Sequence, residues 1–226
     1  MKKSLLVVPV LLTLALPALG ASSFLGGYSG NIITPDAVIV PTGTWELSYH
    51  TFGDLILDED LTAIGVQYGL TEDLEVGVSF IDNGDNETAL NAKYRLLEET
   101  ATSPMIAVGV FDAGGSEGID DDPSLFVVIS KNVTPVATDI VGEPSKPLRL
   151  SVGIGSGFFD GFFAGLDWTL QPRLSLMAEY VSGEVGGNDG LFNVGARFAA
   201  TDTVRVDLAT IDFDDFAFGA SLRFGF

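Results

Sequence analysis

The chain ends in Asp215-Phe216-Ala217-Phe218-Gly219-Ala220-Ser221-Leu222-Arg223-Phe224-Gly225-Phe226. Alternate residues of this stretch form two chemically different sets. One set is apolar at every position, and the other is small or polar. Because successive side chains of a β-strand point to opposite faces, a period of two predicts a strand with one apolar face. The apolar set is Phe216, Phe218, Ala220, Leu222, Phe224 and Phe226.

This strand also ends on an aromatic residue, and in that respect it resembles the C-terminal signal strand of bacterial outer-membrane β-barrels. The resemblance implies that the outer-membrane assembly machinery is a partner of the chain. It further implies that the remaining strands repeat the same alternation. The residues that would form the assembly signal are Phe216, Phe218, Leu222, Phe224 and Phe226.

The alternation recurs from residue 44 onward, in segments of about ten residues that are separated by turn-forming residues. Leu74, Val76, Val78 and Phe80 are one example of a presumed lipid-facing set. The alternation is less regular around residues 125–129. We count about twelve segments, and their connections alternate between short and long. The sequence therefore predicts an all-β protein, a transmembrane antiparallel up-and-down β-barrel of about twelve strands.

The N-terminus has the features of an export signal. Lys2 and Lys3 precede an apolar run over residues 5–16, and Ala18-Leu19-Gly20 forms a small-x-small cleavage site. We expect a signal peptide over residues 1–20, a Gly/Pro-rich lead-in over 21–43 and a β-barrel domain over 44–226. The expected location is the outer membrane.

The composition excludes several classes of function. The chain has no Cys, which rules out disulfides, thiolate catalysis and Cys-ligated metals. Its net charge of −20 argues against nucleic acid as a partner. The sequence contains no phosphate-binding Gly loop, metal triad or nucleotide-binding motif, and we predict no cofactor.

The lead-in contains Gly27-Tyr28-Ser29-Gly30-Asn31-Ile32-Ile33-Thr34-Pro35-Asp36-Ala37, followed by Pro41-Thr42-Gly43-Thr44. These two stretches resemble the opening of the YjbH-like family of outer-membrane β-barrels, which are associated with exopolysaccharide. The resemblance implies a role linked to cell-surface polysaccharide. A second interpretation is that this Gly/Pro-rich segment plugs or brackets the mouth of the barrel.

The strand face opposite the lipid-facing set carries five acids and six bases. A nearly balanced set of charges in a narrow barrel is typical of cross-strand ion pairs that fill the lumen. The alternative is a polar channel whose Arg residues attract anionic solutes. The predicted lumen-lining residues are Glu46, His50, Gln67, Glu75, Lys93, Arg95, Arg149, Asp167, Glu179, Arg197, Arg205, Asp207 and Arg223.

The predicted outer loops carry acidic side chains and neither Lys nor Arg. Carboxylates are ligands for Ca²⁺ and Mg²⁺, which could bridge them to anionic lipid, so Asp120, Asp121 and Asp122 are a candidate cation rim. A solubilising rim screened by cations is the simpler interpretation. The expected partners are outer-membrane lipid and lipopolysaccharide, with divalent cations and polysaccharide as candidates.

The sequence thus predicts a non-enzymatic protein, either a small-solute pore or a structural component linked to polysaccharide. Two alternatives stay open. An exported soluble β-barrel or sandwich would turn the apolar face inward. An outer-membrane hydrolase would use the only His, His50, with Ser48 two residues away on the same face.

Overall fold

A computed structural model describes residues 21–53, 60–84, 86–134, 146–185 and 188–225 of the chain. The predicted signal peptide, residues 1–20, and Phe226 of the predicted assembly signal lie outside the described residues.

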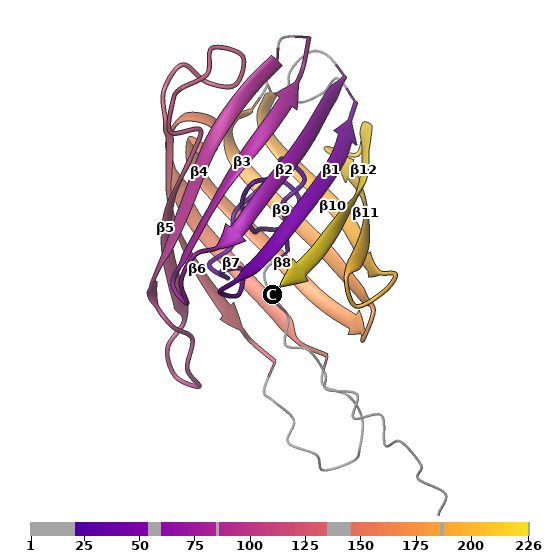
Figure 1. Cartoon of the computed structure of the whole chain (residues 1–226). Helices are drawn as coiled ribbons and strands as arrows, with labels where there is room; N and C mark the ends of the chain where they lie inside the picture. The colour runs from indigo at the N-terminus through magenta and orange to yellow at the C-terminus, as the bar shows by residue number, and fades with distance from the viewer. Residues whose placement is uncertain (1–20, 54–59, 85, 135–145, 186–187, 226) are drawn as a thin grey trace, which may run out of the picture.

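The described residues form twelve antiparallel strands that close into one barrel (Figure 1). The predicted fold class is thereby confirmed. The only helical element among them is one turn of 3-10 helix, η1 (Gly157–Phe159). The strands are β1 (Thr44–Phe52), β2 (Leu61–Gly69), β3 (Leu74–Asp82), β4 (Asn86–Leu97), β5 (Met105–Phe111), β6 (Ser124–Asn132), β7 (Leu148–Gly155), β8 (Gly161–Gln171), β9 (Leu174–Val185), β10 (Asn188–Ala199), β11 (Val204–Ile211) and β12 (Asp215–Gly225).

Each strand pairs with its neighbours in the chain, and β1 closes the ring against β12. This seam runs in register from the pair Thr44 and Gly225 to the pair Phe52 and Ala217. We call the end of the barrel with Thr44 and Gly225 the terminal end, and the opposite end the loop end. Closure leaves no unpaired strand edge, which satisfies the main-chain polar groups of the wall.

The outward face of the wall is apolar. The side chains exposed there belong to the predicted lipid-facing set, and examples are Leu90, Leu208 and Phe218. The charged set points inward and is largely buried. A soluble barrel would need the opposite arrangement, because it must bury its apolar face. The soluble alternative is therefore wrong for this fold.

Aromatic side chains pack in pairs near both ends of the wall. Trp45 and Tyr68 contact each other near the terminal end, with ring centroids 4.4 Å apart. Phe162 and Tyr180, near the loop end, are 5.6 Å apart. Such belts are typical of membrane interfaces, where a ring meets both headgroups and hydrocarbon.

One connection at the terminal end is long. Strands β6 and β7 pair directly, from Phe126 with Gly155 to Asn132 with Arg149, so residues 133–147 connect two neighbouring strands of the wall. Residues 135–145 of this connection lie outside the described part of the chain. No helix in that described part is long and apolar enough to cross a membrane.

A charge on the outward face tests whether this face meets hydrocarbon. Leu90→Arg, near the middle of β4, is expected to lower the free energy of unfolding by about 2–4 kcal/mol, because an Arg near the bilayer midplane is poorly solvated. Asn86→Arg, on the same face at the loop end, should cost about 0–1 kcal/mol. Urea unfolding of the protein in lipid vesicles measures both values. Equal costs would contradict a hydrocarbon-facing wall.

Candidate functional site: the plugged lumen

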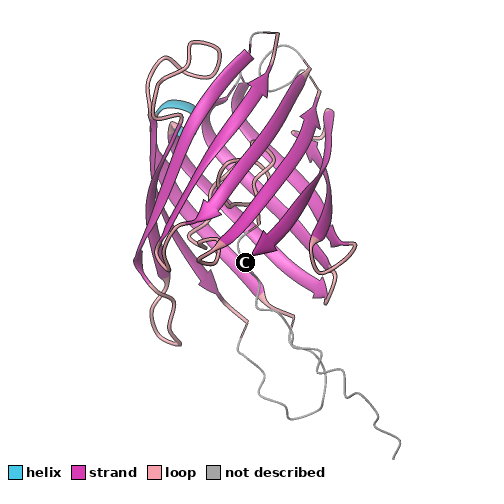
Figure 2. Ribbon diagram, in the orientation of Figure 1, coloured by secondary structure: helices cyan, strands magenta, loops and turns pink. Residues whose placement is uncertain are grey.

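The lumen contains the N-terminal segment of the described chain. Every residue from Ala21 to Val40 is buried, and we call residues 21–40 the plug. Figure 2 shows the plug as an irregular loop inside the ring of strands. It leaves the lumen at the terminal end, where Thr42 bridges Gly69 just before β1 begins. The Gly/Pro-rich lead-in therefore lies inside the barrel, as expected if this segment plugs the lumen.

Three carboxylates of the wall accept main-chain N–H groups of the plug. Glu179 of β9 accepts from Ile32, Ile33 and Thr34 at 3.1, 2.8 and 3.0 Å. A carboxylate inside a protein is stable only when hydrogen bonds replace its lost hydration. The other two are Glu75 of β3, which accepts from Ser29 and Val40 at 2.9 and 2.8 Å, and Glu46 of β1, which accepts from Ser22 at 2.6 Å.

Two cations of the wall bind the carbonyl groups of the plug. Lys93 of β4 donates to the Ser29 oxygen at 2.8 Å, and Arg197 of β10 donates to the Ser22 oxygen at 2.8 Å. Lys93 also lies 3.2 Å from Glu75 and 3.5 Å from Asp36 of the plug. Asp36 therefore adds an acid to the five that the sequence predicted for the wall. The plug brings the charges of the lumen closer to balance.

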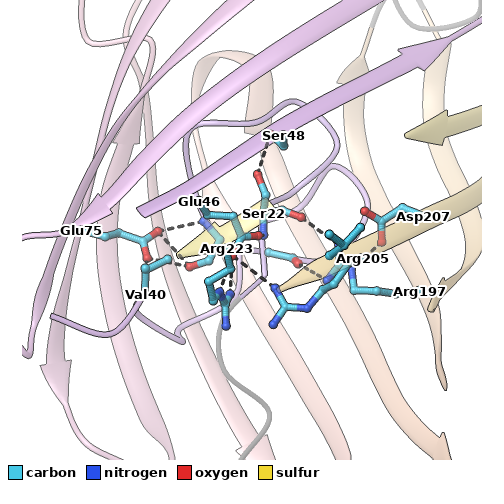
Figure 3. Close-up of polar contacts among 12 residues, drawn as sticks. Ser22, Val40, Glu46, Ser48, Glu75, Arg197, Arg205, Asp207 and Arg223 are labelled. Carbon is cyan, nitrogen blue, oxygen red and sulfur yellow. Dashed lines mark hydrogen bonds and ion pairs between the residues drawn. The ribbon is translucent and has the colours of Figure 1, made fainter. Parts of the chain in front are cut away.

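An ion cluster joins the plug to the seam between β1 and β12 (Figure 3). Glu46 of β1 contacts Arg223 of β12, with Nε 2.7 Å away, and Arg205 of β11 at 3.3 Å. Two residues along β11 from Arg205, Asp207 accepts a hydrogen bond from Arg197 at 2.7 Å and contacts His50 of β1 at 3.0 Å. The same side chains thus hold the seam closed and bind the plug.

The plug main chain lies directly against the wall at two glycines. Gly26 has a φ of +73°, and a Cβ on it would lie 2.5 Å from the Cα of Gly65 in β2. Both facts require glycine at position 26, because other residues are strained at that φ and would overlap the wall. Packing inside the barrel therefore explains one of the glycines of the lead-in.

The lumen has two layers. Most of the charged residues named above lie in the terminal half, whereas the loop half contains a cluster of aromatic rings, which we call the apolar layer, beside a few buried polar groups such as Asp112 and Ser124. In the loop half the Tyr28 ring of the plug packs edge-on against Phe111 of β5 at 5.4 Å and Phe159 of η1 at 6.1 Å. Burial raises the pKa of the Tyr28 hydroxyl, which donates to the Ile33 oxygen at 2.6 Å. Other wall and η1 rings of this layer are Phe52, Phe126, Phe158 and Phe163.

Sequence reasoning missed this apolar layer. Phe111, Phe126 and Phe163 face the lumen, on the parity that was assigned to polar residues. A signal was present in the sequence, since residues 105–111 and 125–129 are nearly continuous apolar runs. Such runs indicate strands that are buried on both faces.

The structure places most of the remaining predicted lumen residues on the inner face. Gln67, Arg149 and Asp167 lie there, and Arg149 stands beside Asp167 in the register of β7 and β8. Arg95 differs, because it pairs at 2.8 Å with Asp73, which lies in the turn between β2 and β3 and outside the plug. In the described ranges no group of three or more acidic or His side chains could hold a metal ion, and this includes Asp120, Asp121 and Asp122.

The residues of the hydrolase alternative have other partners. The Ser48 hydroxyl accepts from Ser22 of the plug at 3.1 Å, and the His50 Nε2 atom contacts Asp207. The His50 ring is also stacked on Phe24 of the plug, with centroids 4.5 Å apart. This arrangement covers His50 with the plug rather than exposing it to a substrate.

Comparison with solved structures finds outer-membrane barrels. The KdgM porin is 12% identical to this chain with a TM-score of 0.53, and the match covers 80% of this chain and 99% of that one. The outer membrane protein Omp33 of Acinetobacter baumannii is 12% identical, with a TM-score of 0.49 and coverages of 81% and 98%. The likeness is one of fold. No family model and no curated protein matches the chain.

Removing one wall carboxylate should loosen the plug locally. We expect Glu179→Ala to speed hydrogen exchange of the amides of Ile32, Ile33 and Thr34 by about 10- to 100-fold, because each bond to a charged group contributes about 1.5–3 kcal/mol. Exchange followed by mass spectrometry measures this. The matched control is Asp73→Ala, which breaks an ion pair outside the plug and should leave these amides unchanged. Unchanged exchange in Glu179→Ala would contradict the clamp.

Proposed function

We propose that the protein is a non-enzymatic channel of the bacterial outer membrane for small solutes, closed at rest by its N-terminal plug. The observation that carries the proposal is the complete burial of residues 21–40 inside a barrel with a porin-like fold. In this proposal the terminal end faces the periplasm and the acidic loop end faces outward. This orientation rests on the acidic residues of the loop-end connections, because connection length does not separate the two ends. The long connection over 133–147 lies at the terminal end, and the connection over 212–214 at the loop end has three residues.

The chemistry of the plug contacts supports a plug that can leave. The plug packs apolar side chains such as Phe24, Ile32 and Ile33 into the buried core, but its main chain is held by hydrogen bonds that water can replace when the segment moves out. Among the described residues, the main-chain-to-main-chain hydrogen bonds of the plug lie within the plug itself. The nearest such bond to the wall runs from the Gly43 N–H to the Gly69 oxygen, three residues beyond the plug, where the chain enters β1. A segment that is tied to the wall at one end can leave the lumen without breaking the barrel.

A structural role linked to cell-surface polysaccharide is the second proposal. It rests on the resemblance of the lead-in to YjbH-like barrels and on the filled lumen, which suits a barrel that passes nothing. The two proposals differ in one observable property. A channel conducts when its plug is displaced, and a purely structural barrel need not.

Displacing the plug should open the barrel. The double variant Gly26→Val/Gly27→Val is expected to give stable unitary current steps in a planar bilayer, because both glycines have a positive φ and Val cannot fit against the wall. The wild-type protein should be silent. The matched control is Gly114→Val in an outer loop, where the nearest atom to an added Cβ is 3.7 Å away.

A heat-dependent gel shift must first show that each variant is folded. A folded double variant without current steps would overturn the channel and favour the structural role.

A reversible lock tests whether plug movement itself opens the channel. The Ser22 and Ser48 hydroxyls are 3.1 Å apart, so Ser22→Cys/Ser48→Cys places two thiols within reach of a disulfide in a chain that otherwise has no Cys. In a Glu179→Ala background, brief openings should disappear on oxidation and return with reductant. Openings that ignore the redox state would mean that current does not depend on the plug.

We expect the open lumen to prefer anions. Asp36 leaves with the plug, and because Arg95 pairs with Asp73 of a turn, the lumen keeps five bases, four of them Arg, against five acids. Adding Arg149→Ala or Arg197→Ala to the double variant should shift the reversal potential in a salt gradient toward cation preference. Arg173→Ala, in an exposed turn at the terminal end, is the control and should leave the potential unchanged. A lumen without anion preference would contradict this assignment.

A further inference from the structure

The wall binds the plug mainly through the main chain of the plug. Carboxylates of the wall accept main-chain N–H groups, and Lys93 and Arg197 donate to main-chain carbonyl groups. The Ser79 hydroxyl donates to the Gly26 carbonyl oxygen at 2.9 Å, and the Ser130 hydroxyl accepts from the Ala37 N–H at 2.9 Å. Main-chain recognition depends little on sequence, because every peptide carries the same donors and acceptors.

The wall also has polar groups that the plug does not use. The side-chain amide of Gln67 is 1% exposed, and neither its nitrogen nor its oxygen has a hydrogen-bond partner in the described structure. The Nδ1 atom of His50, which is fully buried, is in the same situation. A buried polar group without a hydrogen-bond partner lowers the stability of the folded protein. These groups therefore indicate that the inner wall can also bind a ligand other than the plug.

One side chain of the plug fits the apolar layer closely. The Tyr28 ring lies between Phe111 and Phe159, which belong to the wall and to η1 and stay in place when the plug leaves. Ser29, the next residue, binds Lys93 through its carbonyl oxygen. The site for the ring, between Phe111 and Phe159, and the site for the main chain, at Lys93, thus bind consecutive residues of the plug, whose Cα atoms are about 3.8 Å apart.

We propose that the lumen of the open barrel binds short peptides that carry an aromatic side chain, and that such peptides are the solutes it admits. This inference rests on the proposed channel and names its solute class. The plug is then an internal copy of the ligand, with its ring in the aromatic site and its main chain on the charged layer. Small residues before the ring are part of the specificity, because Gly26 lies against Gly65.

The test uses the full chain with the Gly26→Val/Gly27→Val change, which vacates the lumen and leaves every wall residue intact. The probe is the heptapeptide Phe-Leu-Gly-Gly-Tyr-Ser-Gly, a copy of residues 24–30, acetylated and amidated so that it carries no charge. It should cause brief current blockades whose frequency rises linearly with concentration. The same peptide with Val-Val in place of Gly-Gly should block at least about tenfold less often, and maltoheptaose should not block.

A wall variant separates recognition from simple obstruction. Ser79→Ala in the same background removes the bond from the wall to the carbonyl group that corresponds to Gly26. It should shorten the blockades about two- to tenfold, as expected for the loss of one neutral hydrogen bond, without changing the unitary current. Current steps with no blockade, or equal blockade by the Val-Val peptide and the sugar, would overturn the peptide inference and leave the channel standing. A folded variant with no steps would overturn both.

Discussion

The structure of the lumen depends on one requirement, which is that the buried carboxylates of the wall need hydrogen-bond donors. Glu46, Glu75 and Glu179 are taken out of water by the closed wall, and each cross-strand cation can satisfy only part of a carboxylate. The plug provides the remaining donors from its main chain, and its carbonyl groups in turn occupy Lys93 and Arg197. Wall and plug therefore stabilise each other, and neither set of polar groups is satisfied alone.

The strands and their inward and outward faces could be predicted from the sequence, because a period of two determines both. Leu74, Val76, Val78 and Phe80 show the reason, since one apolar face against lipid leaves only the other face for charge. The charged residues that the sequence places on the inner face are largely buried there in the structure. Arg95 shows the limit of parity, because position along the strand decides whether an inward residue meets the plug or a turn.

The partners of the lumen charges could not be predicted, because they are main-chain atoms. Any residue can supply an N–H group, so the sequence does not mark Ile32 or Val40 as a ligand of a glutamate. The positive φ of Gly26 and its approach to Gly65 are visible only once the segment is inside the barrel. The apolar layer is not evident from alternation for a different reason. Alternation places Phe126 on the face expected to be polar, whereas the continuous apolar run over residues 125–129 indicates that both faces of the strand are apolar.

The ion cluster at the seam has a consequence for how the molecule assembles. Arg223 lies on β12, the strand that closes the ring against β1, and it binds the same Glu46 that holds the Ser22 amide. The first described residues of the plug are thus fully held only after the final strand has docked on β1. Docking of β12 on β1 thus completes the contacts of the carboxylate that holds the start of the plug, so a barrel whose seam is incomplete would hold its plug less tightly.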